Sequence, residues 1–365
     1  MLLARRNLFR DRTRFLLSVL GVAVAIMLIL LLAGYRAGLY RQASAYLDHT
    51  PGSLVVAERG IRDFLGTSSV LPPAAADAVR KIPGVGRVIP VVSQFVIFER
   101  HGRKDGFFLV GYDPAAGGGP WRLVEGREPA ADDELVVDRI VARQHQIAIG
   151  DRLRLLDREA TVVGLSDETS VWSGSIAFAR ITTLESLLRA PGLRSFLIIS
   201  PPAGVGAEAL RDRIDVPGTE VLLKTDVVAN DRRLLARVYD APVGLMVGIA
   251  FFVGVLVVGL VIYTATIERW REYGALKAIG ARNRVLYRVV TTQALIAATG
   301  GAILGVGLAF AVATVLMTWR PQFRVDLEPA AIGVVLAGSL VMALLAALIP
   351  ARVIARLEPA EVLRS

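Results

Sequence analysis

Residues that could perform catalysis or hold a metal ion are few in this chain and are scattered along it. The sequence has no cysteine, and its histidines lack the short spacings of metal-ligand motifs. The histidines are His49, His101 and His145. None of the lysines follows a glycine, so the Gly-Lys-Ser/Thr phosphate cradle of a P-loop ATPase is missing. The lysines are Lys81, Lys104, Lys224 and Lys277. We therefore predict no catalytic residue, no metal site and no cofactor bound by this chain.

Two further stretches could suggest chemistry but have simpler explanations. The sequence "AAGGGP" (115–120) neither opens a helix nor carries a following lysine, so we expect a loop. The sequence "ADDE" (131–134) is expected to be a solvated turn and not a catalytic pair of carboxylates. We also expect each histidine to be an exposed polar residue, so the sequence offers no enzyme site.

One polar segment stands out by its position between two highly apolar stretches. It reads "REYGALKAIGARNR" (271–284), and three apolar residues in it recur every three positions, which predicts a stripe along one side of a short helix. The stripe consists of Tyr273, Leu276 and Ile279. Gly280 is expected to end this helix, and Asn283 to cap the next. Three interpretations remain: a helix on anionic lipid, an ordinary basic loop, or an element that docks into a groove of a soluble partner.

The elements that must position this segment are membrane helices. The chain is 54% hydrophobic, and four of its windows contain no Asp, Glu, Lys or Arg. The windows are residues 15–35, 243–267, 289–319 and 330–349. Each reaches the roughly 20 residues that a helix needs to cross the hydrocarbon core of a bilayer. We predict four transmembrane helices. A cleaved signal peptide is the alternative for the first, but its apolar run exceeds the usual length of about 7–15 residues, which favours a signal anchor.

The distribution of charge predicts the orientation. Residues 36–241 carry 26 basic and 26 acidic side chains, and residues 320–329 carry two of each. The net charge of +9 therefore comes from both termini and residues 268–288. Because basic residues concentrate on the cytoplasmic side, both termini and the 271–284 segment are expected in the cytoplasm and the large insert outside. Membrane topology accounts for the charge, so no nucleic-acid partner is predicted.

The insert between the first two windows alternates short β-like runs with amphipathic helices. The expected fold class is an α-helical membrane protein with four transmembrane helices and a large α+β extracytoplasmic domain between the first and second. We expect two lobes, one inserted in the other. Residues 35–47 and 226–240 keep helical spacing and are predicted to prolong the first two membrane helices as stalks.

The membrane windows exclude one class of transporter. An ion-coupled carrier usually places ionisable residues within its helices, and these windows have none. They contain instead glycines four residues apart, which let helix backbones approach closely. The pairs are Gly244 with Gly248 and Gly301 with Gly305. We favour packing within one subunit over a dimer interface for both pairs.

Several motifs together resemble the MacB/FtsX-type (type VII) family of ABC transporter permeases. "RRNLFRDRTRFLLSVLGVAVA" is similar to the start and first span of that family, and "REYGALKAIGARNRVLYRVVTTQALIAATGGAILG" to the segment after its second span. "IPARVIARLEPAEVLR" is similar to its C-terminal motif, while "LVEGREP" and "IGDRLRLL…ATVVGL" resemble phrases of its outer domain. The outer domain is smaller than in drug-efflux MacB proteins, and the layout is closer to the DevC or HrtB-like branch.

The resemblance implies a division into three parts and a set of partners. Residues 1–35 would form a cytoplasmic amphipathic segment and the first span, residues 36–241 the outer domain with its stalks, and residues 242–365 the FtsX-like permease domain. Two copies of this permease would work in the bacterial cytoplasmic membrane with two copies of an ATPase subunit, which binds ATP and Mg. Residues implied in coupling to that subunit are Arg271, Glu272, Tyr273, Gly274, Leu276, Lys277, Ile279 and Gly280.

Two functions from different classes follow from the resemblance. The favoured one is export or extraction of an amphipathic or hydrophobic substrate, such as a lipid, haem, peptide or drug, with a membrane-fusion adaptor as a further partner. The alternative is an FtsX-like mechanotransducer that activates an extracytoplasmic cell-wall hydrolase. A cargo entering laterally would meet Met27, Tyr35, Tyr239 and Met246 at the outward ends of the first two spans, although we favour anchoring and packing at the interface as the explanation of these residues.

Overall fold

The computed structural model describes residues 12–355, apart from residues 65, 101, 172, 173, 269, 280 and 321. The chain forms two compact units. The helical unit contains the residues up to Gly38 and from Tyr239 onward, and the outer unit contains Leu39–Val238. The predicted boundaries at residues 35 and 241 thus lie within a few positions of the division between the units.

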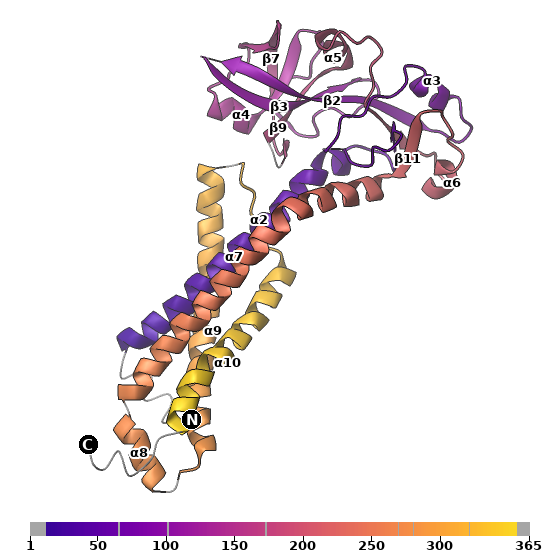
Figure 1. Ribbon diagram of the computed structural model, residues 1–365. Coiled ribbons are helices and arrows are strands. Elements are labelled where there is room, and N and C mark those ends of the chain that lie inside the picture. The colour runs from indigo at the N-terminus through magenta and orange to yellow at the C-terminus, as the bar shows by residue number, and fades with distance from the viewer. Residues whose placement is uncertain are drawn as a thin grey trace. The chain divides into compact units, whose positions relative to one another are not determined.

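The helical unit contains four helices that are long and apolar enough to cross a membrane, counted within the described residues. They are α2 (Arg12–His49), α7 (Lys224–Glu268), α9 (Asn283–Trp319) and α10 (Pro329–Ala355). Both α2 and α7 continue past their apolar windows into residues of the outer unit without interruption (Figure 1). The prediction that the first two spans continue as stalk helices is therefore confirmed.

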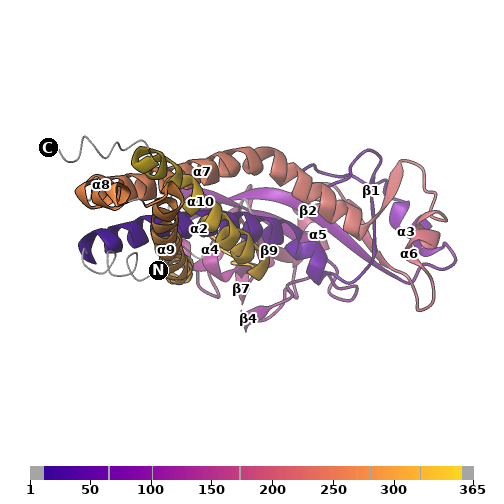
Figure 2. The same ribbon diagram turned by 90° about the horizontal axis from the view of Figure 1, so that it is seen from below.

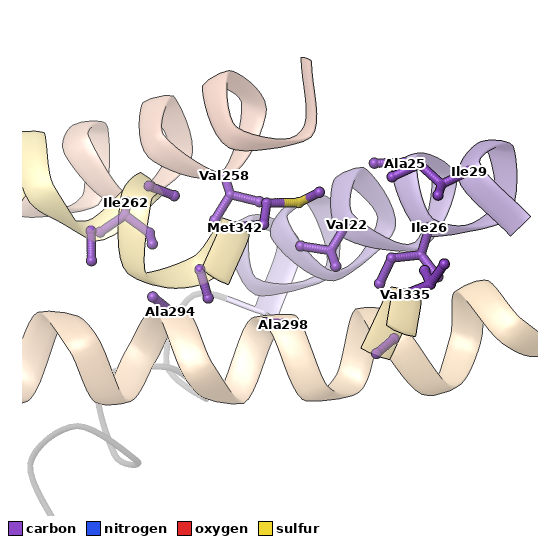
Figure 3. Close-up of a cluster of buried hydrophobic side chains, with 14 of the residues drawn as sticks. Val22, Ala25, Ile26, Ile29, Val258, Ile262, Ala294, Ala298, Val335 and Met342 are labelled. Atoms are coloured by element: carbon purple, nitrogen blue, oxygen red, sulfur yellow. The ribbon is translucent and has the colours of Figure 1, made fainter. Parts of the chain in front are cut away.

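Small and branched apolar side chains form the core of the helical unit (Figure 3). Ala294 and Ala298 of α9 lie in this core with Val22 and Ile26 of α2. The glycines of α9 make the approach of the two helices closer still. A Cβ atom on Gly301 would lie 2.4 Å from the Cβ of Val22, a distance that real Cβ atoms do not reach. Close packing within one subunit is thus confirmed for this part of α9.

The second predicted glycine pair behaves differently. Added Cβ atoms on Gly244 and Gly248 of α7 would meet no atom within 4 Å. The expectation that this pair packs within the subunit was therefore wrong, because no neighbouring helix approaches α7 at these two positions.

The described residues of the outer unit form one eleven-stranded sheet with short helices on it. The strands are β1 (Leu54–Glu58), β2 (Arg87–Arg100), β3 (Arg103–Tyr112), β4 (Leu123–Gly126), β5 (Glu134–Asp138), β6 (Arg152–Leu155), β7 (Arg158–Ser166), β8 (Ser170–Val171), β9 (Gly174–Arg180), β10 (Phe196–Ser200) and β11 (Thr219–Leu223). The short helices are α3 (Ala75–Arg80), α4 (Arg139–Gln144), α5 (Ile181–Leu187) and α6 (Ala207–Arg211). The strand order is β11-β1-β10-β2-β3-β9-β5-β7-β4, with β6 on β2 and β7 and with β8 on β9.

Long strand β2 joins the two lobes. Its first residues pair with β10 in the lobe that contains α3 and α6, and its remainder pairs with β3 in the lobe that contains α4 and α5 (Figure 2). The second lobe is inserted in the chain between β2 and β10, in the order that the sequence suggested. One sheet nevertheless runs through both lobes, and β2 is a single strand.

The two faces of the sheet are covered by different helices. The described helices α3, α4, α5 and α6 pack on one face, and Val79 of α3 and Leu184 of α5 are buried against the sheet there. On the other face, Tyr46 and Leu47 at the end of α2 and Val227 at the start of α7 join the sheet residues in a common core. Lys224 donates from its Nζ atom to the carbonyl oxygens of Leu47 and Thr50, each at 3.1 Å, and so ties the two helix ends together.

Candidate functional site

The predicted coupling segment is helical and corresponds to α8 (Trp270–Ala278). It begins two residues after the end of α7 at Glu268, and residue 269 between the two helices lies outside the described part. Figure 1 shows α8 at the end of the helical unit where α9 begins and α10 ends. A short turn then leads to Asn283, the first residue of α9. The expectation that Asn283 caps α9 was wrong: Arg282 occupies the cap position, with the extended backbone of a cap but no side-chain hydrogen bond.

The described coupling residues present charge and one exposed aliphatic side chain. Arg271 and Glu272 are exposed, Lys277 is half-buried and Gly274 is buried. Ile279, in the turn after α8, is 86% exposed. Exposure of a large aliphatic side chain to this degree is unfavourable in water by about 1.5–3 kcal/mol relative to full burial. The side chains of Tyr273 and Leu276 and the whole of Gly280 lie outside the described part, so the stripe itself stays a prediction.

The residues after α8 attach the segment firmly to the membrane helices. Leu286 and Val290, in the first two turns of α9, are fully buried in the helical core. Between them Tyr287 remains 37% exposed, and Val285 just before them 52%. A load applied at α8 would therefore reach the packed core through α9 as well as through α7.

A second candidate site is an apolar cavity of about 340 Å³ among three helices of the same unit. Ile26 and Ile29 of α2 lie on one side of it. The other lining residues are Gly244, Val247, Gly248 and Phe251 of α7 and Val334, Val335, Gly338, Ser339 and Met342 of α10. Ser339 donates its hydroxyl to the Leu336 carbonyl at 2.7 Å, so its polar group is already satisfied. The cavity can accept hydrocarbon but offers no charge or free donor for a polar group.

The four residues predicted to meet a lateral cargo are not gathered in this cavity. Met27 packs partly buried against the helical core, and Met246 is 54% exposed on α7. Tyr35 contacts the ring of Phe323, with centroids 5.9 Å apart, and Tyr239 is half-buried on α7. The cavity lining lies at neighbouring positions on the same two helices, together with α10, which the sequence interpretation left out. The signal that could have revealed it was glycine on both facing helices, since glycine leaves space beside its backbone.

The two described histidines of the outer unit, His49 and His145, have structural partners. His145 is not simply exposed: its Nε2 atom lies 2.7 Å from Asp105 Oδ2, and its ring meets the Phe98 ring edge-on. His49 stacks on Trp121 with ring centroids 4.7 Å apart. His101 lies outside the described residues. Within the part of the chain that the structure describes, no three His, Asp or Glu side chains are grouped as a metal site would require.

The two stretches that suggested chemistry also have structural roles. Residues 115–120 form a loop, as predicted, and the carbonyl of Gly118 accepts a hydrogen bond from the buried Tyr46 hydroxyl at 2.9 Å. In the acidic stretch, Glu134 accepts a two-pronged hydrogen bond from Arg127, which lowers its pKa to about 2. The stretch is thus an ion-paired turn and not a pair of free carboxylates.

One fully buried carboxylate was not singled out from the sequence. Asp138 caps α4 by accepting from the Ile140 backbone N–H at 2.8 Å, and it also accepts from the backbone and hydroxyl of Thr169. Burial raises the pKa of Asp138 above its ordinary value, an effect larger than the opposing effect of these hydrogen bonds. Through its hydrogen bonds to Thr169, Asp138 fastens β5 to the turn after β7.

Comparison with known proteins covers almost the whole chain. The model of the MacB-like periplasmic core domain matches residues 15–216, and that of the FtsX-like permease C-terminal domain matches residues 244–359. An uncharacterized ABC transporter permease of Mycobacterium tuberculosis is 25% identical over 307 residues, which is 83% of each chain. A second permease of that organism is 26% identical over 309 residues, or 84% of each chain.

More distant relatives have names that combine an ATP-binding part with a permease part. The macrolide export ATP-binding/permease protein MacB of Agrobacterium fabrum is 23% identical over an alignment that covers 99% of this chain and 60% of that protein. The periplasmic region of MacB from Actinobacillus actinomycetemcomitans aligns with 49% of this chain and 92% of that structure, with 12% identity and a TM-score of 0.39. The four apolar helices, the α+β unit between the first two and the two matching domain models agree. This chain belongs to the MacB/FtsX-type family of ABC transporter permeases.

Proposed function

We propose that this permease works as a dimer with two copies of a separate ATPase subunit and exports or extracts an amphipathic or hydrophobic molecule. The partner subunit would bind ATP and Mg, because this sequence has no Gly-Lys-Ser/Thr cradle. The helix α8 and its following turn would dock on that subunit. Both termini and α8 would lie in the cytoplasm and the outer unit on the other side of the membrane, as the charge distribution favours.

The continuity of α7 is the observation that carries this proposal. The helix has 45 residues, which corresponds to about 68 Å at 1.5 Å per residue, and α8 follows its last turn almost directly. At its other end, Lys224 and Val227 are fixed to the end of α2 and to the sheet. The helix α7 would therefore connect a displacement of α8 by the ATPase to the outer unit. Transport by outward motion needs no polar channel, in agreement with membrane windows that lack ionisable residues.

Docking is tested with a double variant, Leu276→Ala with Ile279→Ala. Each substitution removes three carbon groups, so if the ATPase buries both side chains the double variant loses about 5 kcal/mol at roughly 0.8 kcal/mol per group. That cost weakens docking more than about 100-fold. We expect the variant to insert in the membrane but to lose the ATPase subunit when the tagged permease is purified and its partners are quantified by mass spectrometry.

A matched control is Trp319→Ala, which removes a side chain that is 81% exposed at the opposite end of α9. This control should retain the ATPase subunit. Full retention by the double variant as well would leave α8 as a helix on the lipid surface.

The choice between exporter and transducer needs a different measurement. ATP hydrolysis by the purified complex should be stimulated by at least one of a panel of lipids, haem, peptides and macrolides if the permease is an exporter. If none of them stimulates it and a co-purified cell-wall hydrolase gains activity with ATP, the FtsX-like mechanotransducer is the function. A membrane-fusion adaptor among the co-purified proteins would support the exporter.

A further inference from the structure

The loop between α9 and α10 lies against α2 at two glycines. A Cβ atom on Gly38 would lie 2.0 Å from the carbonyl oxygen of Arg324 and 2.7 Å from its carbonyl carbon. A Cβ atom on Gly34, one turn earlier, would lie 2.8 Å from Val325 Cγ1 and 2.9 Å from Leu327 Cδ2. All four distances are shorter than real Cβ contacts. The loop thus fills a notch in α2, with its backbone at Gly38 and with side chains at Gly34, and this notch exists only because both positions are glycine.

Further contacts hold the loop in this notch. The backbone N–H of Asp326 donates to the carbonyl oxygen of Gly34 at 2.9 Å, a direct bond between the loop and the helix backbone. The Asp326 carboxylate accepts from Nε of Arg324 at 3.2 Å, which keeps the loop folded on itself. Val325 is buried, and the ring of Phe323 packs against Tyr35. The loop is consequently a packed part of the helical unit.

At the corresponding part of α7, no segment within the described residues packs against the helix at a glycine. Pro242 lies inside this helix, where it cannot donate the usual hydrogen bond to the carbonyl four residues earlier. Gly244 and Gly248 follow, with no atom within 4 Å of an added Cβ, and both line the apolar cavity. A proline followed by two glycines weakens a helix locally, and the open cavity leaves it room to bend.

The direct ion pair that joins α2 and α7 at this level is weak. Arg36 and Asp240 lie 3.7 Å apart, and their side chains are 50% and 41% exposed. Exposed pairs of this kind contribute little to stability, about 0–1 kcal/mol. This ion pair therefore opposes relative movement of the two helices only weakly.

We propose that the α9–α10 loop is a brace that makes α2, α9 and α10 move as one body, and that α7 flexes against them at Pro242–Gly248. Gly34 and Gly38 are the residues that position the brace. This proposal rests on the proposed function. In it, ATP drives a motion of α7, and α2 is the fixed helix against which α7 moves. The helix that carries α8 is then also the helix that bends.

The test uses pairs of spin labels in the complex of the full-length chain with its ATPase. Because the chain has no cysteine, the introduced cysteines are the only labelling sites in the permease, which is labelled before the ATPase is added. One pair, Arg36→Cys with Ala330→Cys, reports the distance between α2 and α10. The other, Arg36→Cys with Met246→Cys, reports the distance between α2 and α7; all three positions are exposed. With a non-hydrolysable ATP analogue, we expect the α2–α7 distance to shift by about 2 Å or more and the α2–α10 distance to stay the same.

The brace itself is tested without nucleotide. Gly38→Val should broaden the α2–α10 distance distribution, because the added side chain collides with the loop backbone. Gly34→Ala should give a smaller broadening, since side-chain methyl groups can yield more readily than backbone. The matched control is Gly244→Val, the same change at an open position of α7, which should leave that distribution narrow.

The outcomes separate the inference from the proposed function. If neither Gly38→Val nor Gly34→Ala changes the distribution of α2–α10 distances, the α9–α10 loop is not a brace. This conclusion does not depend on the result with nucleotide. An α2–α10 distance that changes with nucleotide as much as the α2–α7 distance overturns the division into fixed and flexing helices. If neither distance responds to nucleotide, the flexing of α7 and the ATP-driven function both fail, while the nucleotide-free arm still decides whether the brace exists.

Discussion

Alanine at Gly307 should stabilise this protein and alanine at Gly301 should not, although both residues lie in α9. An added Cβ on Gly301 would lie 2.4 Å from Val22 Cβ and 2.9 Å from the Val19 carbonyl oxygen, whereas one on Gly307 would meet no atom within 4 Å. The gain in helix propensity is the same for both, about 0.8–1 kcal/mol. Only Gly301→Ala also carries the cost of overpacking, about 1–3 kcal/mol.

The free energies of unfolding of the two variants should therefore differ by about 1–3 kcal/mol, with Gly307→Ala above the wild type and Gly301→Ala at or below it. For a domain of roughly 150–250 residues, 1 kcal/mol corresponds to about 2–4 °C in Tm. Thermal unfolding of the full chain in detergent, followed by circular dichroism, measures this difference.

A double variant tests whether the effect comes from the contact between α2 and α9. Val22→Gly removes the side chain that the new methyl group would meet, so Gly301→Ala should be less destabilising in that background than in the wild type. Equal Tm values for Gly301→Ala and Gly307→Ala, or no coupling between positions 22 and 301, would refute the close approach of the two helices.

Three further predictions concern topology and the outer unit. Thr182→Cys should be labelled by an impermeant reagent on intact spheroplasts and Arg282→Cys should not; labelling at Arg282→Cys would reverse the proposed orientation. Tyr46→Phe removes the hydroxyl that donates to Gly118 and should cost about 1–3 kcal/mol, since the carbonyl is left unsatisfied, visible as a lower Tm; an unchanged Tm would mean that water replaces the bond. Because the pKa of Asp138 is raised, the folded state binds the Asp138 proton more tightly than the unfolded state does. Protonated Asp138 therefore contributes to stability at low pH, and this contribution is lost as pH rises from the ordinary pKa of 3.8 through the pKa of the folded state. The wild type should thus exceed Asp138→Asn in Tm by more at pH 4 than at pH 7, and a difference independent of pH would contradict this assignment.

The sequence by itself determined the elements whose signal is local. The four spans follow from windows without charge, and the stalk parts of α2 and α7 follow from helical spacing next to those windows. The alternation of short β-like runs with helices predicted an α+β unit, which strands such as β3 and β10 help to form. The family was recognisable for the same reason, because its motifs lie in continuous stretches of sequence.

Elements with weak local signals were missed. Strand β9 (Gly174–Arg180) is buried on both faces along most of its length, so it shows no alternation of polar and apolar residues. Helix α4 has six residues, too few for a helical period to be visible. The place of β9 beside β3 and β5 is also non-local, since it depends on pairing between strands far apart in the chain.

Tertiary structure alone decided what the glycines do. The long helices carry three glycine pairs with the same spacing of four residues: Gly34 with Gly38, Gly244 with Gly248, and Gly301 with Gly305. One pair holds a loop, one lies beside a cavity and one admits a neighbouring helix. The sequence around a glycine shows that space is available next to the backbone. Which atoms fill that space depends on segments up to about 290 positions away, because packing contacts join residues that no local pattern connects.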